Sequence, residues 1–333
     1  MATIKDVARE AGVSVATVSR VINESPKASK ASIIVVKQAM SKLGYRPNAA
    51  ARALVSQNSH TIGVLVNDVS DPFFGTLVKA VDGVAHRYGK HILICNGYHN
   101  AEEERQSIEL LINNRCDALV IHSKALSDAQ LIDYATEVPS MVLINRHIPQ
   151  ISERCISLNN YQGAYLATEH LIHYGHKNIA YISSNHQIED AEQRLQGYLD
   201  ALKDNNIPYS ENMIEHGSPY GEGGEEAMTN LLAKSLNISA VVAYNDFMAA
   251  GAMSVLDENG IALPQQMSVV GFDDALIARY IHPRLTTVCY PIQMMAEKAT
   301  ELALAISRGD EIHAQSLIYC PKLIQRNSVT RIE

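Results

Sequence analysis

Polar and aromatic residues follow five of the short apolar runs in the sequence. In chain order they are Asp68, Asp71, Phe73, Phe74, Asn145, Arg146, Asp190, Arg194, Asn245, Asp246, Asp273 and Asp274. Carboxylates, amides and guanidinium groups form paired hydrogen bonds with adjacent hydroxyls, and an aromatic ring stacks on an apolar face, so the set suits a sugar. Taken singly, each residue is explained equally well as a turn or helix-capping residue. Their joint occurrence at five run ends favours a shared binding site.

Nine apolar runs, separated by amphipathic segments, must position these residues. The runs are TIGVLV (61–66), HILIC (91–95), DALVIH (117–122), MVLIN (141–145), CISLN (155–159), NIAYIS (178–183), SAVVAYN (239–245), MSVVGF (267–272) and LIYC (317–320). Apolar strands that alternate with helices are typical of parallel sheets covered on both faces. The roughly 270 residues after position 60 are many for one such unit, so we expect two doubly wound lobes. Ligands bind beyond the carboxyl ends of such strands, where the polar residues stand.

Sequence patterns for catalysis are weak. GEGG (221–224) is not followed by the lysine and hydroxyl of a phosphate-binding loop, and neither GxSxG nor HExxH occurs. Asp273 and Asp274 could touch a metal ion, but Phe272 and Ala275 offer no further ligands. We therefore expect no catalytic residues, no metal and no cofactor.

Composition narrows the class of protein. Of 333 residues, 47% are hydrophobic and 19% are charged, which excludes wholesale disorder. No apolar run approaches the ~20 residues that span a bilayer, and the N-terminus does not resemble a secretory signal. The five cysteines stand singly and form no CxxC pair. We expect a soluble cytoplasmic protein with reduced thiols.

The net charge of −8 is unevenly distributed along the chain. Residues 1–58 contain nine Lys or Arg and three Asp or Glu, a net of +6, so the remainder carries −14. A small basic head on a large acidic body is typical of a nucleic-acid-binding module joined to a regulatory domain. A basic helical domain without a partner fits the charge equally well, so the pattern within the head must decide.

The head is predicted to contain three helices. Thr3 caps the first helix and Gly12 ends it, Ser14 caps a second that runs to about Ile22, and a third runs from about Ser32 to Leu43. Two short helices joined by a glycine turn, with a supporting third, form a helix-turn-helix unit.

The second helix of such a unit enters the major groove of DNA with its N-terminal residues toward the bases. Val15 and Ala16 are small enough for close approach, and Arg20 can reach guanine or a phosphate. The hydroxyls of Ser14, Thr17 and Ser19 suit phosphate oxygens, although Ser14 is explained equally well as a helix cap. For Arg20 the alternative is a surface ion pair.

An alanine-rich stretch, residues 48–57, follows the head. It has good helix propensity but is too short for a stable isolated helix, which favours a linker helix that forms on docking. Leu54 is its bulky apolar candidate and could wedge between base steps in the minor groove; alternatively it packs on the head or body.

Several segments resemble the lactose/galactose repressor family of bacterial transcription regulators. IKDVAREAGVSVATVSRVIN (4–23) resembles the family signature and YRPNAAARAL (45–54) its hinge. IGVLV, GHKNIAYIS, AYNDFMAAGAM, SVVGFDD and LTTV resemble its core landmarks in order and spacing. DVSDPFFGTLVKAV, RCDALVIHSKA, MVLINR and ARYIHPRLTTVCYPI are similar to its galactose-responsive members. The resemblance covers the whole chain.

The resemblance implies roles for individual residues. Val15, Ala16 and Arg20 would read bases, Ser14, Thr17, Ser19 and Asn23 would hold the DNA backbone, and Leu54 would be the hinge wedge. Asp71, Phe73, Asn145, Asp190, Arg194, Asn245 and Asp273 match sugar-contacting positions. Galactose-binding periplasmic proteins stack a tryptophan on the second sugar face, but this chain has no Trp. Tyr220 is the candidate substitute.

The implied architecture is a small all-α helix-turn-helix head (1–47), a hinge helix (48–58) and a two-lobed α/β core (59–333) like the periplasmic binding proteins. The N-lobe would comprise about 61–160 with 291–320, and the C-lobe about 161–290 with 321–333. The chain ends without the leucine-repeat tail that makes some relatives tetramers, so we expect a homodimer.

The implied function is repression of genes for galactose metabolism and transport. Operator DNA would be the macromolecular partner, and a sugar inducer, D-galactose, would release it. The alternatives are a repressor that responds to another sugar or a purine, and a sugar-binding transport receptor. The receptor does not explain the basic head.

Overall fold

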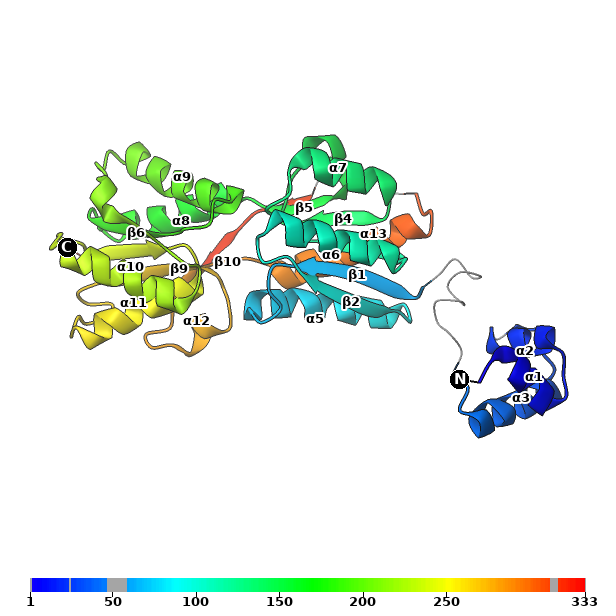
Figure 1. The fold of residues 1–333 in the computed structure, drawn as a ribbon. Helices are drawn as coiled ribbons and strands as arrows, with labels where there is room; N and C mark the ends of the chain where they lie inside the picture. The colour runs from blue at the N-terminus through cyan, green and yellow to red at the C-terminus, as the bar shows by residue number, and fades with distance from the viewer. Residues whose placement is uncertain (1, 24, 47–58, 312–316, 333) are drawn as a thin grey trace.

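The head is a bundle of three helices in the computed structural model, which describes residues 2–23, 25–46, 59–311 and 317–332 (Figure 1). Its helices are α1 (Ile4–Ala11), α2 (Val15–Ile22) and α3 (Lys30–Leu43). Thr3 and Asp6 form a reciprocal cap at the start of α1, and Gly12 ends that helix at φ 66°, a conformation that suits glycine. Val7, Val18 and Val36 bring the helices together as a fully buried core. The head thus has its own hydrophobic core.

The N-lobe contains a six-stranded parallel sheet in the order β11-β5-β4-β3-β1-β2. Its strands are β1 (Thr61–Val66), β2 (His91–Asn96), β3 (Ala118–Ile121), β4 (Met141–Ile144), β5 (Cys155–Leu158) and β11 (Leu317–Tyr319). Its helices are α5 (Pro72–Arg87), α6 (Ala101–Asn113), α7 (Asp128–Glu137) and α13 (Ile292–Ser307). Leu111 and Leu131 bury α6 and α7 against one face, and Leu77 and Met295 bury α5 and α13 against the other. Both faces are covered, which explains why β1, β3, β4 and β5 are apolar along their length.

The C-lobe repeats this plan with the sheet order β12-β10-β9-β8-β6-β7. Its strands are β6 (Ile179–Ser184), β7 (Ile214–Gly217), β8 (Ala240–Ala243), β9 (Ser268–Asp273), β10 (Thr286–Cys289) and β12 (Lys322–Ile324), the last antiparallel to β10. Its helices are α8 (Asn160–His173), α9 (Glu189–Asp204), α10 (Gly221–Ala233), α11 (Asp246–Glu258) and α12 (Ile277–Tyr280). Helices α8 and α9 can pack closely because Gly197 has no side chain. A Cβ at this position would lie 2.2 Å from the backbone oxygen of Tyr161.

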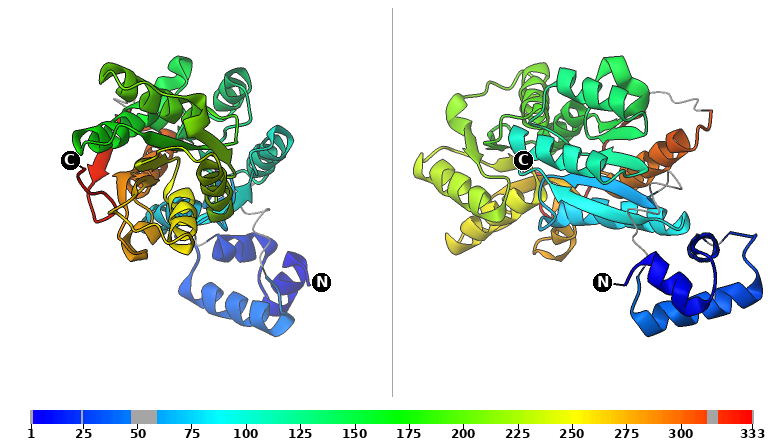
Figure 2. Two further views of the ribbon diagram at one scale, coloured as in Figure 1. Left: turned by 90° about the vertical axis from the view of Figure 1, so that its left-hand side faces the viewer. Right: turned by 45° about the vertical axis from the view of Figure 1, so that its right-hand side comes forward.

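The chain crosses between the lobes three times: after β5 into α8, after β10 into α13, and between β11 and β12. These crossings lie side by side between the two sheets (Figures 1 and 2). The carboxyl ends of the central strands of both lobes therefore face the same space. No helix in the described part of the chain combines the length and apolar character needed to cross a membrane.

The predicted class, a helix-turn-helix head with a two-lobed parallel α/β core, is confirmed, and all nine apolar runs form strands. Three strands were not predicted: β7, β10 and β12. Helix α3 starts at Lys30, two residues before the predicted start, because Ser29 accepts a hydrogen bond from the Ser32 amide and caps the helix there.

Candidate ligand-binding cleft and nucleic-acid interface

A cleft of about 600 Å³, part of it open to solvent, lies between the lobes at the carboxyl ends of their strands. All eight residues predicted for the ligand site line it: Asp71, Phe73, Asn145, Asp190, Arg194, Tyr220, Asn245 and Asp273. Four other residues from the same run ends do not line it; one of them, Asp68, accepts a 2.8 Å hydrogen bond from the Ser70 amide. Asp246 is fully buried beneath the cleft, Asp274 pairs with Arg326 and Arg279, and Arg146 pairs with Asp128.

Eleven further residues line the cleft and were missed from the sequence. They are Asn67, Phe74, His99, His122, Lys124, His186, Ile188, Pro219, Tyr244, Phe247 and Tyr290. Phe74 was noted after the first run but was not carried into the predicted site. His99, His122 and Lys124 follow strands β2 and β3, so extending the run-end rule to these two strands finds them.

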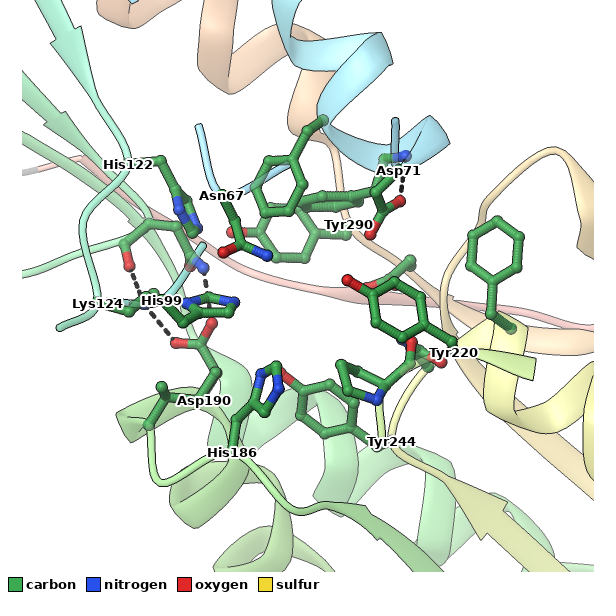
Figure 3. A pocket seen from close by; sticks show the side chains of 18 of the residues that line it. Asn67, Asp71, His99, His122, Lys124, His186, Asp190, Tyr220, Tyr244 and Tyr290 are labelled. Carbon is green, nitrogen blue, oxygen red and sulfur yellow. Dashed lines mark hydrogen bonds and ion pairs between the residues drawn. The ribbon is translucent and has the colours of Figure 1, made fainter. Parts of the chain in front are cut away.

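Buried polar atoms without hydrogen-bond partners are concentrated in the cleft (Figure 3). Six of them belong to residues that line it: Asn67 Oδ1, His99 Nδ1, His122 Nδ1, Asn145 Oδ1, His186 Nδ1 and the Tyr290 hydroxyl. A buried polar atom without a partner is unfavourable by about 1–3 kcal/mol. A ligand rich in hydroxyls can both donate to and accept from such atoms, so the cleft suits a polyhydroxylated molecule.

The three cleft histidines form a chain of ring contacts. His99 lies with its ring centroid 4.8 Å from that of His186 and 6.4 Å from that of His122. Burial, with the neighbouring His186 and Lys124, lowers the pKa of His99 to about 4. Burial, Lys124 and His99 lower the pKa of His122 to about 3, and burial lowers the pKa of His186. Neutral imidazoles carry one donor and one acceptor each, so they can both donate hydrogen bonds to sugar hydroxyls and accept hydrogen bonds from them.

Asp190 joins the two lobes. Its Oδ1 lies 2.7 Å from Lys124 Nζ, and its Oδ2 accepts a 2.7 Å hydrogen bond from Asn145 Nδ2. Lys124 Nζ also donates to the backbone oxygen of Asn145. Burial disfavours the ionised Asp190, but Lys124 and Arg194 outweigh it and lower the pKa of the carboxyl. Both carboxylate oxygens of Asp190 are thus engaged by the opposite lobe.

Arg194 is held from several sides on the C-lobe wall. Its Nε donates to Asn160 Oδ1 at 2.8 Å and its Nη1 to the Tyr244 backbone oxygen at 2.6 Å. The guanidinium lies 3.6 Å from the Phe272 ring centroid, and its Nη1 lies 3.7 Å from Asp273 Oδ1. These contacts fix the fork of donors at the cleft wall.

Asp273 has an unusual backbone conformation and a shifted side-chain pKa. Its φ of 109° lies in a region that side chains other than glycine rarely adopt, so its placement at the cleft is under strain. Burial raises its pKa to about 7, although Arg194 opposes the shift. Asp246 holds the turn after it, because Asp246 Oδ2 accepts a 2.7 Å bond from the Ala275 amide and Oδ1 accepts from the Thr287 hydroxyl at 2.5 Å.

Two predicted ligand residues are also helix caps. Asp71 accepts from the Phe73 amide at 2.8 Å and begins α5, and Asn245 accepts from the Met248 amide at 2.8 Å and begins α11. These two residues therefore cap helices and line the cleft at the same time. Phe73 lies edge-on to Tyr290, with ring centroids 5.0 Å apart, and Tyr220 stands half-exposed across the cleft (Figure 3).

The charges lining the cleft nearly balance. Among the described lining residues, Asp71, Asp190 and Asp273 are acidic, and Lys124 and Arg194 are basic. This balance favours an uncharged ligand over a phosphorylated one. Within the described residues, no group of three or more His, Cys, Asp or Glu side chains is spaced to hold a metal ion.

In the head, the residues predicted to contact DNA lie on α2 and at its two ends. Val15, Ala16 and Arg20 are exposed. Ser14 is the N-cap, because its Oγ accepts from the Thr17 amide at 3.1 Å, and Asn23 is the C-cap and donates to the Ser19 hydroxyl at 3.4 Å. The ion pairs of the described head join Arg9 to Asp6 and Lys42 to Glu10, and neither involves Arg20. Leu54 and the predicted hinge lie outside the described residues.

Comparison with known proteins gives the family. Residues 3–48 match "Bacterial regulatory proteins, lacI family", and residues 59–325 match "Periplasmic binding proteins and sugar binding domain of LacI family". The chain belongs to the lacI family. It is 55% identical over 330 residues to the HTH-type transcriptional regulator GalR of Escherichia coli K12, covering 99% of this chain and 96% of GalR. It is 54% identical over 329 residues to the regulator GalS of Salmonella typhimurium LT2, covering 99% and 97%.

A solved structure agrees with this family assignment. The crystal structure of the lac repressor dimer, bound to operator and the anti-inducer ONPF, superposes on 99% of each chain with a TM-score of 0.84 at 26% identity. The lacI-family chain therefore has the same fold, a helical head and two α/β lobes, as a relative solved on DNA.

Proposed function

We propose that this lacI-family chain is a cytoplasmic, sequence-specific repressor of genes for galactose metabolism and transport, released from its operator by D-galactose. Its similarity to GalR and GalS supports both the regulatory role and the choice of sugar. The observation that carries the ligand half is the set of six partnerless buried polar atoms that line one cleft.

The DNA half of the proposal rests on α2. A homodimer presents two heads, each of which places α2 in the major groove of one half of a pseudo-palindromic operator. Exposed Val15 and Ala16 allow close approach to base edges, and Arg20 reaches guanine or a phosphate. Ser14, Thr17, Ser19 and Asn23 face the DNA backbone, while paired hinge segments carry Leu54 into the central minor groove.

The ligand half of the proposal rests on the cleft. The rings of Phe73 and Tyr220 flank the sugar, and the polar groups of Asn145, Asn245 and Asp273 bond its hydroxyls. The near balance of cleft charges supports a neutral hexose. Asp71, Asp190 and Arg194 complete the proposed site.

Coupling requires that the sugar bind the low-affinity state of the repressor more tightly. Galactose closes the cleft, shifts the dimer interface and unfolds the hinge. A coupling free energy of ~1–3 kcal/mol changes operator affinity about 5–150-fold.

Fluorescence anisotropy on a selected operator tests the proposal. The full-length protein selects its operator from random-sequence duplexes, and its affinity is then measured with D-galactose, D-glucose or hypoxanthine. We expect D-galactose to weaken operator binding, with matched random DNA as the control duplex. If the selection yields no preferred sequence, the proposal that the protein binds a specific operator is contradicted. An effect of D-glucose or hypoxanthine alone would assign a different effector.

A further inference from the structure

A second hollow lies behind the cleft, on the side of the chain crossings. This rear pocket has a volume of about 590 Å³, part of it open to solvent. It is lined, among others, by Arg146, His147, Asn159, Asn160, Gln193 and Ile318.

The cleft and the rear pocket share one wall. Asn145 and Asp190 line both hollows, and they come from opposite lobes. The 2.7 Å bond from Asn145 Nδ2 to Asp190 Oδ2 therefore spans the boundary between them. Lys124 closes the same boundary from the cleft side, since its Nζ contacts both Asp190 Oδ1 and the Asn145 backbone oxygen.

The wall is built from buried, mutually satisfied charges. The side chain of Lys124 is 1% exposed and that of Asp190 is 8% exposed. Removing one partner of a buried ion pair leaves an uncompensated charge, so the pair resists displacement by a neutral ligand. To pass between the cleft and the rear pocket, a sugar hydroxyl would have to replace both the ionic contact between Lys124 and Asp190 and the hydrogen bond from the Asn145 amide to Asp190.

We propose that Lys124, Asp190 and Asn145 form a wall that restricts the cleft to a monosaccharide. The inference rests on the proposed sugar-binding function and deepens it. With the wall intact, the ligand occupies the cleft alone. With the wall reduced, the cleft and the rear pocket join, and the polar groups of Asn159 and Gln193 are available to a second sugar unit. Asp190 thereby acts as a specificity-determining residue through the length of its side chain.

A matched pair of double variants separates shape from charge. Lys124→Met/Asp190→Ala removes both charges and shortens the wall, whereas Lys124→Met/Asp190→Asn removes both charges and keeps its length. The full-length variants and the wild type are titrated calorimetrically with D-galactose, lactose, melibiose and β-1,4-galactobiose, which extend galactose at C1 or at C4. The measured quantity is the ratio of disaccharide affinity to galactose affinity for each protein.

The proposal predicts a higher ratio only where the wall is shortened. For at least one disaccharide, the ratio for Lys124→Met/Asp190→Ala exceeds that for Lys124→Met/Asp190→Asn by about tenfold or more, the scale set by steric fit in a pocket. The wild-type protein has the same ratio of disaccharide affinity to galactose affinity as Lys124→Met/Asp190→Asn. Equal ratios in the two double variants would overturn the proposal that the wall restricts the cleft. Wild-type protein that binds a disaccharide about as tightly as galactose would overturn it too.

Two further measurements keep the test decisive. If the Ala-bearing double variant does not fold, Lys124→Met/Asp190→Ser replaces it, because serine is also shorter than asparagine and is tolerated in a first helical turn. Asp128→Asn removes the ion pair between Asp128 and Arg146 beside the rear pocket and leaves the wall intact, so its ratio matches wild type. Wild type that binds no galactose would refute the proposed inducer; wild type that binds galactose, with double variants that do not differ, would refute the wall alone.

Discussion

At the residue scale, Arg194 serves the fold and the proposed ligand with different atoms. Its Nε and Nη1 already donate to Asn160 and to the backbone of Tyr244, and its plane lies on the Phe272 ring. Arg194 stands four residues after Asp190 in the sequence, and both residues line the cleft. The internal bonds add a structural role that the spacing did not reveal.

We predict that Arg194→Ala abolishes the response to D-galactose while the folded protein still binds operator. The substitution removes a charged donor from the cleft and leaves the acceptors on Asn160 and Tyr244 unpaired, which lowers the free energy of unfolding by on the order of 1–3 kcal/mol. Calorimetry gives the galactose affinity, anisotropy the operator affinity and urea titration the stability. Arg194→Lys, which keeps the charge without the fork, is the control. Unchanged galactose affinity in the alanine variant would exclude Arg194 from the site.

Asp273 gives a pH-dependent prediction. Its pKa in the folded protein is about 7, above the ordinary value near 4, because it is buried. Between about pH 4 and pH 7 the folded state keeps a proton that the unfolded state has released, so this group makes the protein less stable as pH rises through that window. Asp273→Asn lacks this contribution. We expect the stability of the variant relative to wild type to increase from pH 5 to pH 8 in urea titrations. A difference that stays constant over this range would contradict the assignment.

The same residue is predicted to be needed for induction. Asp273→Ala removes an acceptor from the cleft that the sugar-free, operator-binding state does not require. Galactose should then fail to release the variant from operator, although operator affinity without sugar is retained. Anisotropy with and without D-galactose checks this, and galactose release equal to that of wild type would remove Asp273 from the proposed site.

At the scale of elements, α2 is a short helix whose buried face is Val18 and Val21 and whose opposite face is exposed. We predict that Arg20→Ala weakens binding to operator by about 1–3 kcal/mol and weakens binding to random DNA much less, because a base contact carries sequence information. Arg9→Ala on α1 is the control, since Arg9 is exposed and the first helix of such a unit crosses the backbone. Equal losses on both duplexes for Arg20→Ala would make it a phosphate contact.

The strands show how far sequence patterns reach. Runs such as ALVI in β3 are apolar throughout because both faces of the sheet are covered, and the runs therefore locate nine strands. Strand β7 is IEHG and β10 begins with two threonines, so their hydrophobic patterns are weak. Strand β12 has three residues and owes its conformation to pairing with β10 rather than to its own sequence.

The cleft shows the corresponding limit for sites. Run ends located seven of the eight predicted residues, because the topology of parallel sheets brings strand ends together. The eighth, Tyr220, was predicted from the family resemblance. The contact between Lys124 and Asp190 was not predictable, since it depends on how the two lobes are oriented. Tyr290 was also missed, because it follows β10, a strand that the pattern did not reveal.

At the scale of the whole molecule, charge divides the chain into a basic head region of +6 and an acidic remainder of −14. Binding of the basic region releases counterions from DNA, so operator affinity should fall steeply with salt. With about 6–10 phosphate contacts, the loss between 50 and 200 mM salt is about 10³–10⁵-fold. Anisotropy over a salt series measures the slope. A flat plot of log affinity against log salt would contradict the electrostatic role of the head.

The central claim is that one molecule couples a sugar in the cleft to DNA on the head, and thermodynamic linkage tests it most directly. The galactose affinity of the full-length protein is measured by calorimetry, free and saturated with operator, beside the operator affinity with and without galactose. Reciprocity requires both ratios to be the same. We predict that operator weakens galactose binding by the factor, about 5–150, by which galactose weakens operator binding. Galactose affinity that is identical in the free and operator-bound protein would contradict the account.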